Sequence, residues 1–140
     1  MPIRCEIVSQ DRVVYTDDVD IVVLPGAGGV MGILPNHSPV LTTLQFGIIT
    51  VRKKGEEQFF TVAGGVAEVQ PDQVTVLADA AENVEEIDTQ RAEAARKRAE
   101  ELLQKGVGPD TDQYLAIQAA LRRSNLRLDA AHRLRRSRRS

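Results

Sequence analysis

The character of the sequence changes abruptly at Ile87, and this change limits the fold more than any other feature. Before Ile87, short runs rich in Val, Ile and Thr alternate with turn residues; after it, Ala, Glu, Arg, Gln and Leu predominate. β-Branched runs favour strands, whereas unbranched residues favour helices. We therefore predict a β domain over residues 1–86 and a helical domain over residues 87–140.

Short apolar runs in the first domain predict seven strands, over residues 3–9, 13–15, 19–24, 47–52, 58–63, 66–70 and 73–78. Turn residues separate them, among them the pair Gly64 and Gly65. Turns at intervals of roughly 8–12 residues are typical of sandwiches and barrels. No segment with helical periodicity lies between these runs, so parallel crossovers are not expected. The prediction is a small antiparallel β-sandwich.

Two helices are predicted in the second domain, one over residues 87–105 and one from residues 110–112 to residues 132–134. Asp88 or Thr89 is expected to cap the first helix. Its end is expected at three helix-breaking residues, Gly106, Gly108 and Pro109. The arginine-rich run over residues 133–140 is interpreted as a disordered basic tail, with an anchor on an acidic partner as the alternative.

Small and apolar residues recur at steps of three and four along both helices and would form the seam of an antiparallel hairpin. In the first helix they are Ala92, Ala95, Ala99 and Leu102, and in the second Ile117, Leu121, Ser124 and Leu128. Because alanine buries little apolar area, we expect the hairpin to be marginally stable alone and able to detach. The fold expected for the whole chain is an N-terminal antiparallel β-sandwich followed by a C-terminal two-helix hairpin.

Charge is divided unequally between the two domains. Residues 1–86 contain five Lys or Arg and 13 Asp or Glu, whereas residues 87–140 contain 13 Lys or Arg and seven Asp or Glu. The net charges are therefore −8 and +6, so the two halves face different partners or each other. The acidic first domain would repel a phosphate backbone, which argues against nucleic-acid binding.

The β domain contains no pattern typical of catalysis. Gly26, Gly28 and Gly32 resemble a dinucleotide-binding turn, but the prolines at 35 and 39 exclude the helix that such a turn requires. We therefore interpret this stretch as a glycine-rich loop between strands. The adjacent His37 and Ser38 lack a third orienting group. No metal-binding spacing occurs either. We predict no catalytic centre and no metal site, and we interpret residues 33–42 as an ordered contact surface.

The single cysteine, the short apolar runs and the first residues of the sequence indicate in which cellular compartment the chain is located. Cys5 is the only cysteine, so neither a disulfide framework nor a cysteine metal site is expected. No apolar run approaches ~18 residues, and the first residues do not resemble a signal peptide. We expect a location in a reducing compartment, on the cytoplasmic side of a membrane.

Four arginines are spaced so that they share helix faces. Arg91 and Arg98 are seven residues apart, and Arg123 and Arg127 are four apart. In an antiparallel hairpin, Arg91 and Arg127 would lie close together near Glu82. Four converging guanidinium groups either point apart into water or enclose an anion, and arginine binds phosphate with two parallel bonds. Ordinary solvated helix faces are the alternative, since several Glu–Lys and Glu–Arg pairs also have i,i+4 spacing.

Three motifs in order carry a family resemblance: GILPNHSPVLTTL over residues 32–44, VAGGVAEVQPDQVTVLADAAE over 62–82 and IDTQRAEAARKRAE over 87–100. The chain resembles the epsilon subunit of F-type ATP synthase, to about Ala131. The resemblance implies a non-catalytic subunit of the central stalk that binds the gamma subunit and the c-ring. It implies attachment to the cytoplasmic face of the bacterial membrane, or its plastid equivalent, only through the complex.

The resemblance also implies two sets of contact residues. Residues 87–92 match the motif I/L-D-x-x-R-A through which some relatives bind ATP. The implied nucleotide site comprises Glu82, Ile87, Asp88, Arg91, Ala92, Arg98, Arg123 and Arg127, with the arginines on the phosphates. The implied rotor contact comprises Val30, Met31, Ile33, Leu34, Pro35, His37 and Pro39. Many relatives carry an acidic residue where Val30 and Met31 stand, so an apolar contact with the ring is expected. No cofactor is required, and ATP is expected as a regulatory ligand.

Regulation would follow from neutralisation of the arginines. ATP stabilises the folded hairpin; without it, the basic second helix extends toward acidic segments of the beta subunits and blocks ATP hydrolysis. A purely structural connector is the alternative from another class, and a stand-alone nucleotide-sensing protein is a third.

Overall fold

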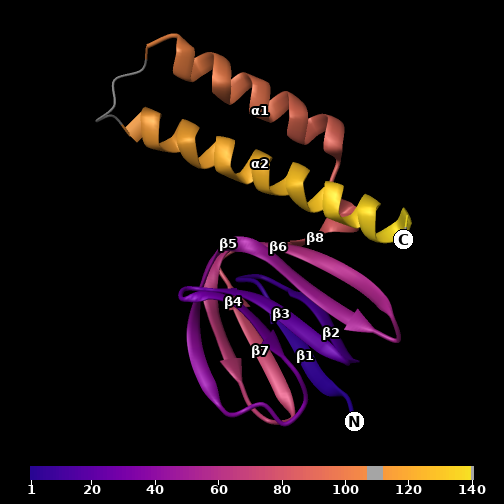
Figure 1. The fold of residues 1–140 in the computed structure, drawn as a ribbon. Helices are drawn as coiled ribbons and strands as arrows, with labels where there is room; N and C mark the ends of the chain where they lie inside the picture. The colour runs from indigo at the N-terminus through magenta and orange to yellow at the C-terminus, as the bar shows by residue number, and fades with distance from the viewer. Residues whose placement is uncertain (107–111, 140) are drawn as a thin grey trace.

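The computed structural model describes residues 1–106 and 112–139. A β head is followed by a pair of antiparallel helices that lies across one end of the head (Figure 1). The strands are β1 (Ile3–Val8), β2 (Val13–Val19), β3 (Ile21–Gly26), β4 (Gly29–Ile33), β5 (Val40–Lys53), β6 (Glu56–Val69), β7 (Gln73–Ala78) and β8 (Ala81–Asn83). A 3₁₀ turn, η1 (Val84–Glu86), leads to α1 (Thr89–Gln104) and α2 (Asp112–Arg139). The predicted β-sandwich and two-helix architecture is confirmed.

The strands hydrogen-bond in the order β2-β1-β7-β6-β5-β3-β4, with β8 also on β6. The two longest strands, β5 and β6, pair antiparallel along nearly their whole length and bend, so that the sheet folds over onto itself (Figure 1). Between the two layers lies an aliphatic core to which β1, β3, β5, β6 and β7 all contribute alternate residues. Phe60 is its largest fully buried side chain, and the Tyr15 ring packs against it at 5.0 Å between centroids.

Gly64 and Gly65 lie inside β6 rather than in a turn. Both have positive φ angles, +93° and +134°, which glycine adopts readily. The strand bends there, so its first half pairs with β8 and its second half with β7. The predicted turn is therefore wrong, and the two strands predicted over residues 58–63 and 66–70 are one.

Two further predictions about the head are wrong. The first is that no strands pair in parallel: β1 pairs with β7 in parallel. This is possible because the strands between β1 and β7 in the sequence themselves form the crossover connection. The glycine-rich stretch is not simply a loop: β4 pairs antiparallel with β3, and Gly29, at φ +133°, is the first residue of β4 after the tight reversal. Glycine makes this hairpin possible, because a residue with a side chain rarely adopts that φ.

Burial makes the thiol of Cys5 unreactive. Desolvation, with a smaller contribution from the Glu6 carboxylate, raises the pKa of Cys5 to about 12. The thiolate is the reactive form, and an unfolded cysteine has a pKa of about 8.5. At pH 8 we therefore expect Ellman's reagent to react at least about 100-fold more slowly with the native protein than with the chain in denaturant. Rapid reaction of one thiol per native chain would contradict this burial.

The first helix begins as its sequence predicts. Of the two candidate caps, Asp88 is the N-cap: its side chain accepts a hydrogen bond from the backbone N–H of Arg91 at 3.1 Å. Gly106 follows the helix with φ +84°, as expected of a residue that ends a helix. The other predicted terminators, at positions 108 and 109, lie outside the described residues.

The two helices pack along the predicted seam. Ala92 and Ala99 of α1 and Ile117 and Ser124 of α2 are buried. The Ser124 hydroxyl donates to the backbone carbonyl oxygen of Ala120 at 2.9 Å, so this buried polar side chain is satisfied within its own helix. The short side chains of α1 let the two backbones approach closely.

A second hydrophobic cluster attaches the hairpin to the head, and the sequence analysis did not predict it. α2 lies between α1 and the head (Figure 1). The cluster consists of Ile48, Phe59 and Val84 from the head and Ala130 and Ala131 from α2, with Ile87, Leu126 and Leu134 packed against it. α2 also continues to Arg139, so the predicted disordered tail is wrong for residues 133–139. Ser140 lies outside the described residues.

Candidate functional site

A hollow of about 390 Å³ lies where the head meets the hairpin. Its volume falls within the range typical of small-molecule sites, about 300–1,000 Å³. β8, the linker after it, the first turns of α1 and the middle of α2 meet there. The lining residues are Glu82, Glu86, Ile87, Asp88, Arg91, Ala92, Ala95 and Arg127. The structure thus brings together six of the eight residues predicted for the nucleotide site.

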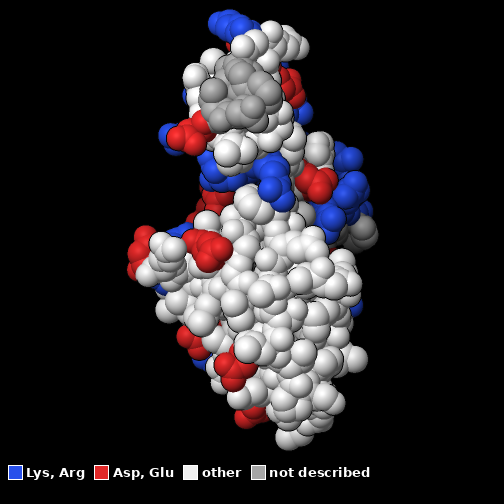
Figure 2. Space-filling model, turned by 90° about the vertical axis from the view of Figure 1, so that its left-hand side faces the viewer, with Lys and Arg blue, Asp and Glu red and all other residues white. Residues whose placement is uncertain are grey.

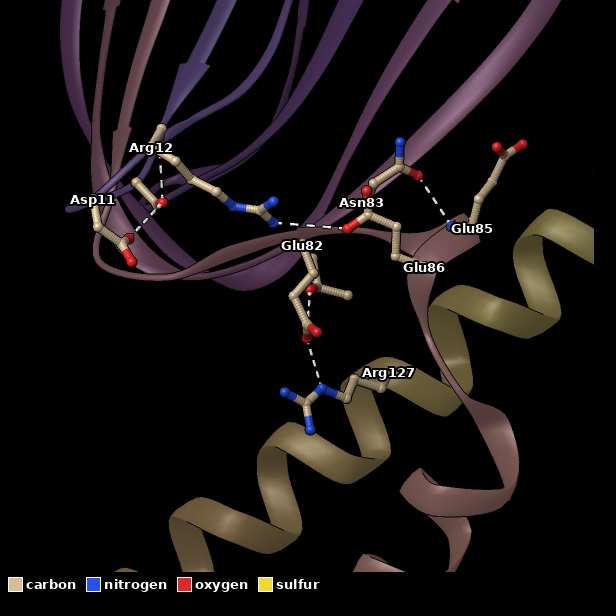
Figure 3. A network of polar contacts seen from close by, with 9 residues as sticks. Asp11, Arg12, Glu82, Asn83, Glu85, Glu86 and Arg127 are labelled. Carbon is tan, nitrogen blue, oxygen red and sulfur yellow. Dashed lines mark hydrogen bonds and ion pairs between the residues drawn. The ribbon is translucent and has the colours of Figure 1, made fainter.

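Glu82 connects the head to α2 at this hollow. The Arg127 Nε–H donates to Glu82 Oε1 at 2.6 Å, and the Thr61 hydroxyl donates to the same oxygen at 3.4 Å (Figure 3). Thr61 is buried on β6, directly opposite Glu82 in the β6–β8 pairing. A charge-assisted hydrogen bond is stronger than a neutral one, so Glu82 fixes the position of the Arg127 guanidinium.

Arg91 is the cation at the hollow that has no carboxylate partner. Its backbone N–H is taken by Asp88, but its side chain forms no ion pair with any described residue. It stands in the first turn of α1, where the helix dipole and unpaired N–H groups favour an anion. Asp88 has a structural role as N-cap whatever else it contacts.

The remaining two predicted arginines lie elsewhere. Arg123 lines an adjoining hollow of about 180 Å³ between β6 and α2, which shares Glu82 and Arg127 with the first. Arg98 is exposed and lines neither, because seven residues carry it about 10 Å along α1, away from the head. The predicted convergence of four guanidinium groups is therefore wrong: two of them meet in the hollow, and Glu82 neutralises one.

Several contacts at this junction were missed by the sequence analysis. Thr61 carries no sequence signal, because its role depends on β6 lying beside β8. The Arg122 guanidinium lies 4.4 Å from the centre of the Phe46 ring, a cation–π contact between α2 and the head. Arg12 of the head pairs with Glu86 of η1 at 3.7 Å (Figure 3).

The predicted rotor-contact residues do not form one patch. Val30 is 79% exposed near the start of β4, whereas Leu34 is 58% exposed just beyond its end. Four residue steps, or roughly 13 Å of extended chain, separate them. Ile33 is fully buried in the head core, so the prediction that it contacts a partner is wrong for this conformation. The other four lie at the surface: Pro39 is exposed, and Met31, Pro35 and His37 are partly exposed.

The described residues contain neither a membrane-spanning helix nor a metal cluster. None of the helices over residues 1–106 and 112–139 is both long and apolar enough to cross a bilayer. Over the same residues, no three His, Cys, Asp or Glu side chains are grouped so that they could hold a metal ion.

Comparisons with known proteins agree on one family. Residues 2–84 match "ATP synthase, Delta/Epsilon chain, beta-sandwich domain", and residues 85–132 match "ATP synthase, Delta/Epsilon chain, long alpha-helix domain". The ATP synthase epsilon chain of Herpetosiphon aurantiacus is 44% identical over 99% of both chains. That of Bacillus licheniformis is 42% identical over 92% of this chain and 97% of its own.

A solved structure shows the same fold. The fold is shared, at a TM-score of 0.66 and 23% identity, with a chain in the cryo-EM structure of the Euglena gracilis mitochondrial ATP synthase. The alignment covers 97% of this chain and 81% of that one. Both domain matches, the relatives and the fold lead to the same assignment: the chain belongs to the family of ATP synthase epsilon chains and is a non-catalytic subunit.

Proposed function

We propose that this epsilon chain is a central-stalk subunit of a proton-translocating F-type ATP synthase. Its head links the gamma subunit to the c-ring, and its hairpin restrains ATP hydrolysis by the alpha and beta subunits. ATP is a regulatory ligand of the folded hairpin. The complex holds the chain at the cytoplasmic face of the bacterial membrane. The observation that carries the proposal is the family match over both domains together with a hollow that only the docked hairpin completes.

Exposed apolar side chains on the head support its role as a docking domain. Leu41, Val66 and Leu77 point outward from three adjacent strands, with Val66 directly opposite Leu77. On the face shown in Figure 2, much of the head is uncharged, whereas Lys and Arg gather on the hairpin. Clustered exposed apolar residues mark interaction sites. We assign the sheet face that bears Leu41, Val66 and Leu77 to the gamma subunit, and the two ends of β4, at Val30 and Leu34, to the c-ring.

The attachment of the hairpin is weak enough to be regulated. The α2 residues that are buried against the head are two alanines, and alanine buries little apolar area. We therefore expect the free energies of the docked and extended forms to differ by only a few kcal/mol, so that a ligand that distinguishes them shifts the equilibrium.

ATP distinguishes the two forms because the hollow is built from both domains. Glu82 belongs to the head, whereas Arg91 and Arg127 belong to the two helices. In the proposed complex the phosphates lie beside Arg91 and the first turn of α1, and Glu82 and Asp88 face the nucleoside. A ligand bound only to the docked form, at 100 times its Kd, stabilises that form by about 2.7 kcal/mol.

One observation favours the alternative that the hairpin is a passive connector. Glu82 already neutralises Arg127 at 2.6 Å without any ligand, so the hollow is less cationic than the arginine spacing suggests. Titration of ATP decides between the two proposals.

Replacing Arg91 by alanine is expected to weaken ATP binding about 10- to 100-fold, because a hydrogen bond to a charged group contributes about 1.5–3 kcal/mol. Isothermal titration calorimetry of the purified chain, with and without Mg²⁺, measures the change. Lys97→Ala removes the same charge about 120° around the helix and should bind like wild type. Arg98→Ala should also change little. If the wild type does not bind ATP at millimolar concentration, or if Arg91→Ala binds it equally well, the alternative that the hairpin is a passive connector is supported instead.

A further inference from the structure

The C-terminal end of α2 rests on an acidic surface of the head. Arg138 forms an ion pair with Glu85 of η1, and the Ser137 hydroxyl donates to Glu57 Oε1 of β6 at 3.2 Å. These residues and the β5–β6 turn around Gly55 surround a hollow of about 420 Å³, separate from the one at Arg91. A hydrogen-bonded contact between positions 57 and 137 joins the head to the far end of the chain.

The charges on the two sides of this contact are opposite. Five arginines and no acidic residue occur in residues 133–139. The head presents three glutamates that line this hollow: Glu56 and Glu57 at the start of β6, and Glu85 in η1. Opposite charges concentrated on two facing surfaces attract one another before contact and favour one docking orientation.

Apolar packing accompanies the charges. Leu134, in the same last turns of α2, packs against the cluster of Ile48, Phe59 and Ala131 that holds α2 on the head. Release of the charged end would therefore also expose the Leu134 end of this cluster. The α2 side of the contact follows the match to the long alpha-helix domain, which ends at residue 132.

We propose that the acidic surface formed by Glu56, Glu57 and Glu85 is a docking surface for residues 133–139 of the same chain. The contact, here called the C-terminal clasp, holds the hairpin on the head without nucleotide. Each exposed ion pair shifts an equilibrium only about two- to fivefold, so the clasp depends on several charges acting together. Salt shortens the range of such attraction to about 3 Å at 1 M, so the clasp loosens as ionic strength rises.

Charge reversal with rescue tests the clasp on the full chain in the absence of ATP. At 20 mM salt, Arg138→Glu and Glu85→Arg should each speed amide hydrogen exchange in residues 126–139 about three- to tenfold. The double variant, Arg138→Glu with Glu85→Arg, should return exchange to within about twofold of wild type. Both exchanged side chains are more than half exposed, so the fold tolerates them.

Arg98→Glu is the matched control, because it makes the same charge change at an exposed residue of α1 that lies away from the head and forms no ion pair in the described chain. Equal effects of Arg138→Glu and Arg98→Glu, or failure of the double variant to rescue, would overturn the clasp. So would differences between wild type and the single variants that persist unchanged at 1 M salt. Absence of ATP binding would overturn the nucleotide site and leave the clasp intact.

Discussion

Replacing Ala130 by glutamate is expected to release the hairpin from the head while the head stays folded. Ala130 is 0% exposed and packs beside Ile48 and Phe59. A carboxylate at this position has no cation within the cluster, and burial of an unpaired charge costs several kcal/mol. Undocking of α2 avoids that cost, because it returns the new carboxylate to water.

The head should survive this release because its own core is separate. Phe60 and the other residues of the sandwich core pack with one another and not with α2. We expect amides of residues 117–134 to exchange at least about 100-fold faster, equivalent to about 2.8 kcal/mol, while exchange in the sandwich core changes little. Ala116→Glu, at an exposed position of the same helix, should leave both rates near those of wild type.

The same variant tests the proposed restraint on hydrolysis. If the undocked hairpin blocks rotation, an assembled complex that contains Ala130→Glu should hydrolyse ATP more slowly than one that contains Ala116→Glu. Faster exchange together with unchanged hydrolysis would mean that the hairpin is a connector. Unchanged exchange would show instead that Ala130 does not hold the hairpin on the head.

The sequence predicted the elements well where local signals determine them. The change of composition at Ile87, a cap at Asp88 or Thr89 and the alanine seam are visible in the local sequence. In the structure the strands end before Ile87, Asp88 is the cap, and Ala92 and Ala99 are buried along the seam. The order of the strands in the sheet could not be predicted from local signals, because β1 pairs with β7 only after the whole sandwich has closed. The predicted end of the second helix was wrong because the head, not the local sequence, supplies the carboxylates beside Arg138.

At the candidate site, too, local sequence patterns did not determine which side chains meet in space. The motif over residues 87–92 and the family resemblance indicated Arg91, Arg127 and Glu82, which line one hollow in the structure. Spacing alone suggested four converging arginines, because it takes no account of where the head ends: Arg98 lies beyond it, while Glu82 neutralises Arg127. Thr61 could not be predicted, since it is an ordinary strand residue until β8 lies beside it.

The bend in β6 carries the second large expected effect: Gly65→Ala should destabilise the head by about 3 kcal/mol. Gly65 has φ +134°, which a residue with a side chain rarely adopts. A Cβ atom there would lie 2.3 Å from the carbonyl oxygen of Leu77 and 2.8 Å from the Cα of Ala78. Both obstacles are backbone atoms of β7, so no side-chain rotation relieves the clash, and backbone strain and overpacking each cost about 1–3 kcal/mol.

Denaturant unfolding followed by circular dichroism measures this loss as a lower midpoint at unchanged slope. Gly28→Ala is the matched control, since a Cβ at Gly28 would meet nothing within 4 Å and its backbone needs no positive φ; its free energy of unfolding should stay within about 0.5 kcal/mol of wild type. Equal stability of the two variants would mean that β7 moves away from β6 at little cost. In that case the bend would not be the reason that β7 and β8 pair with separate halves of β6. Other contacts would then have to hold Glu82 of β8 opposite Thr61.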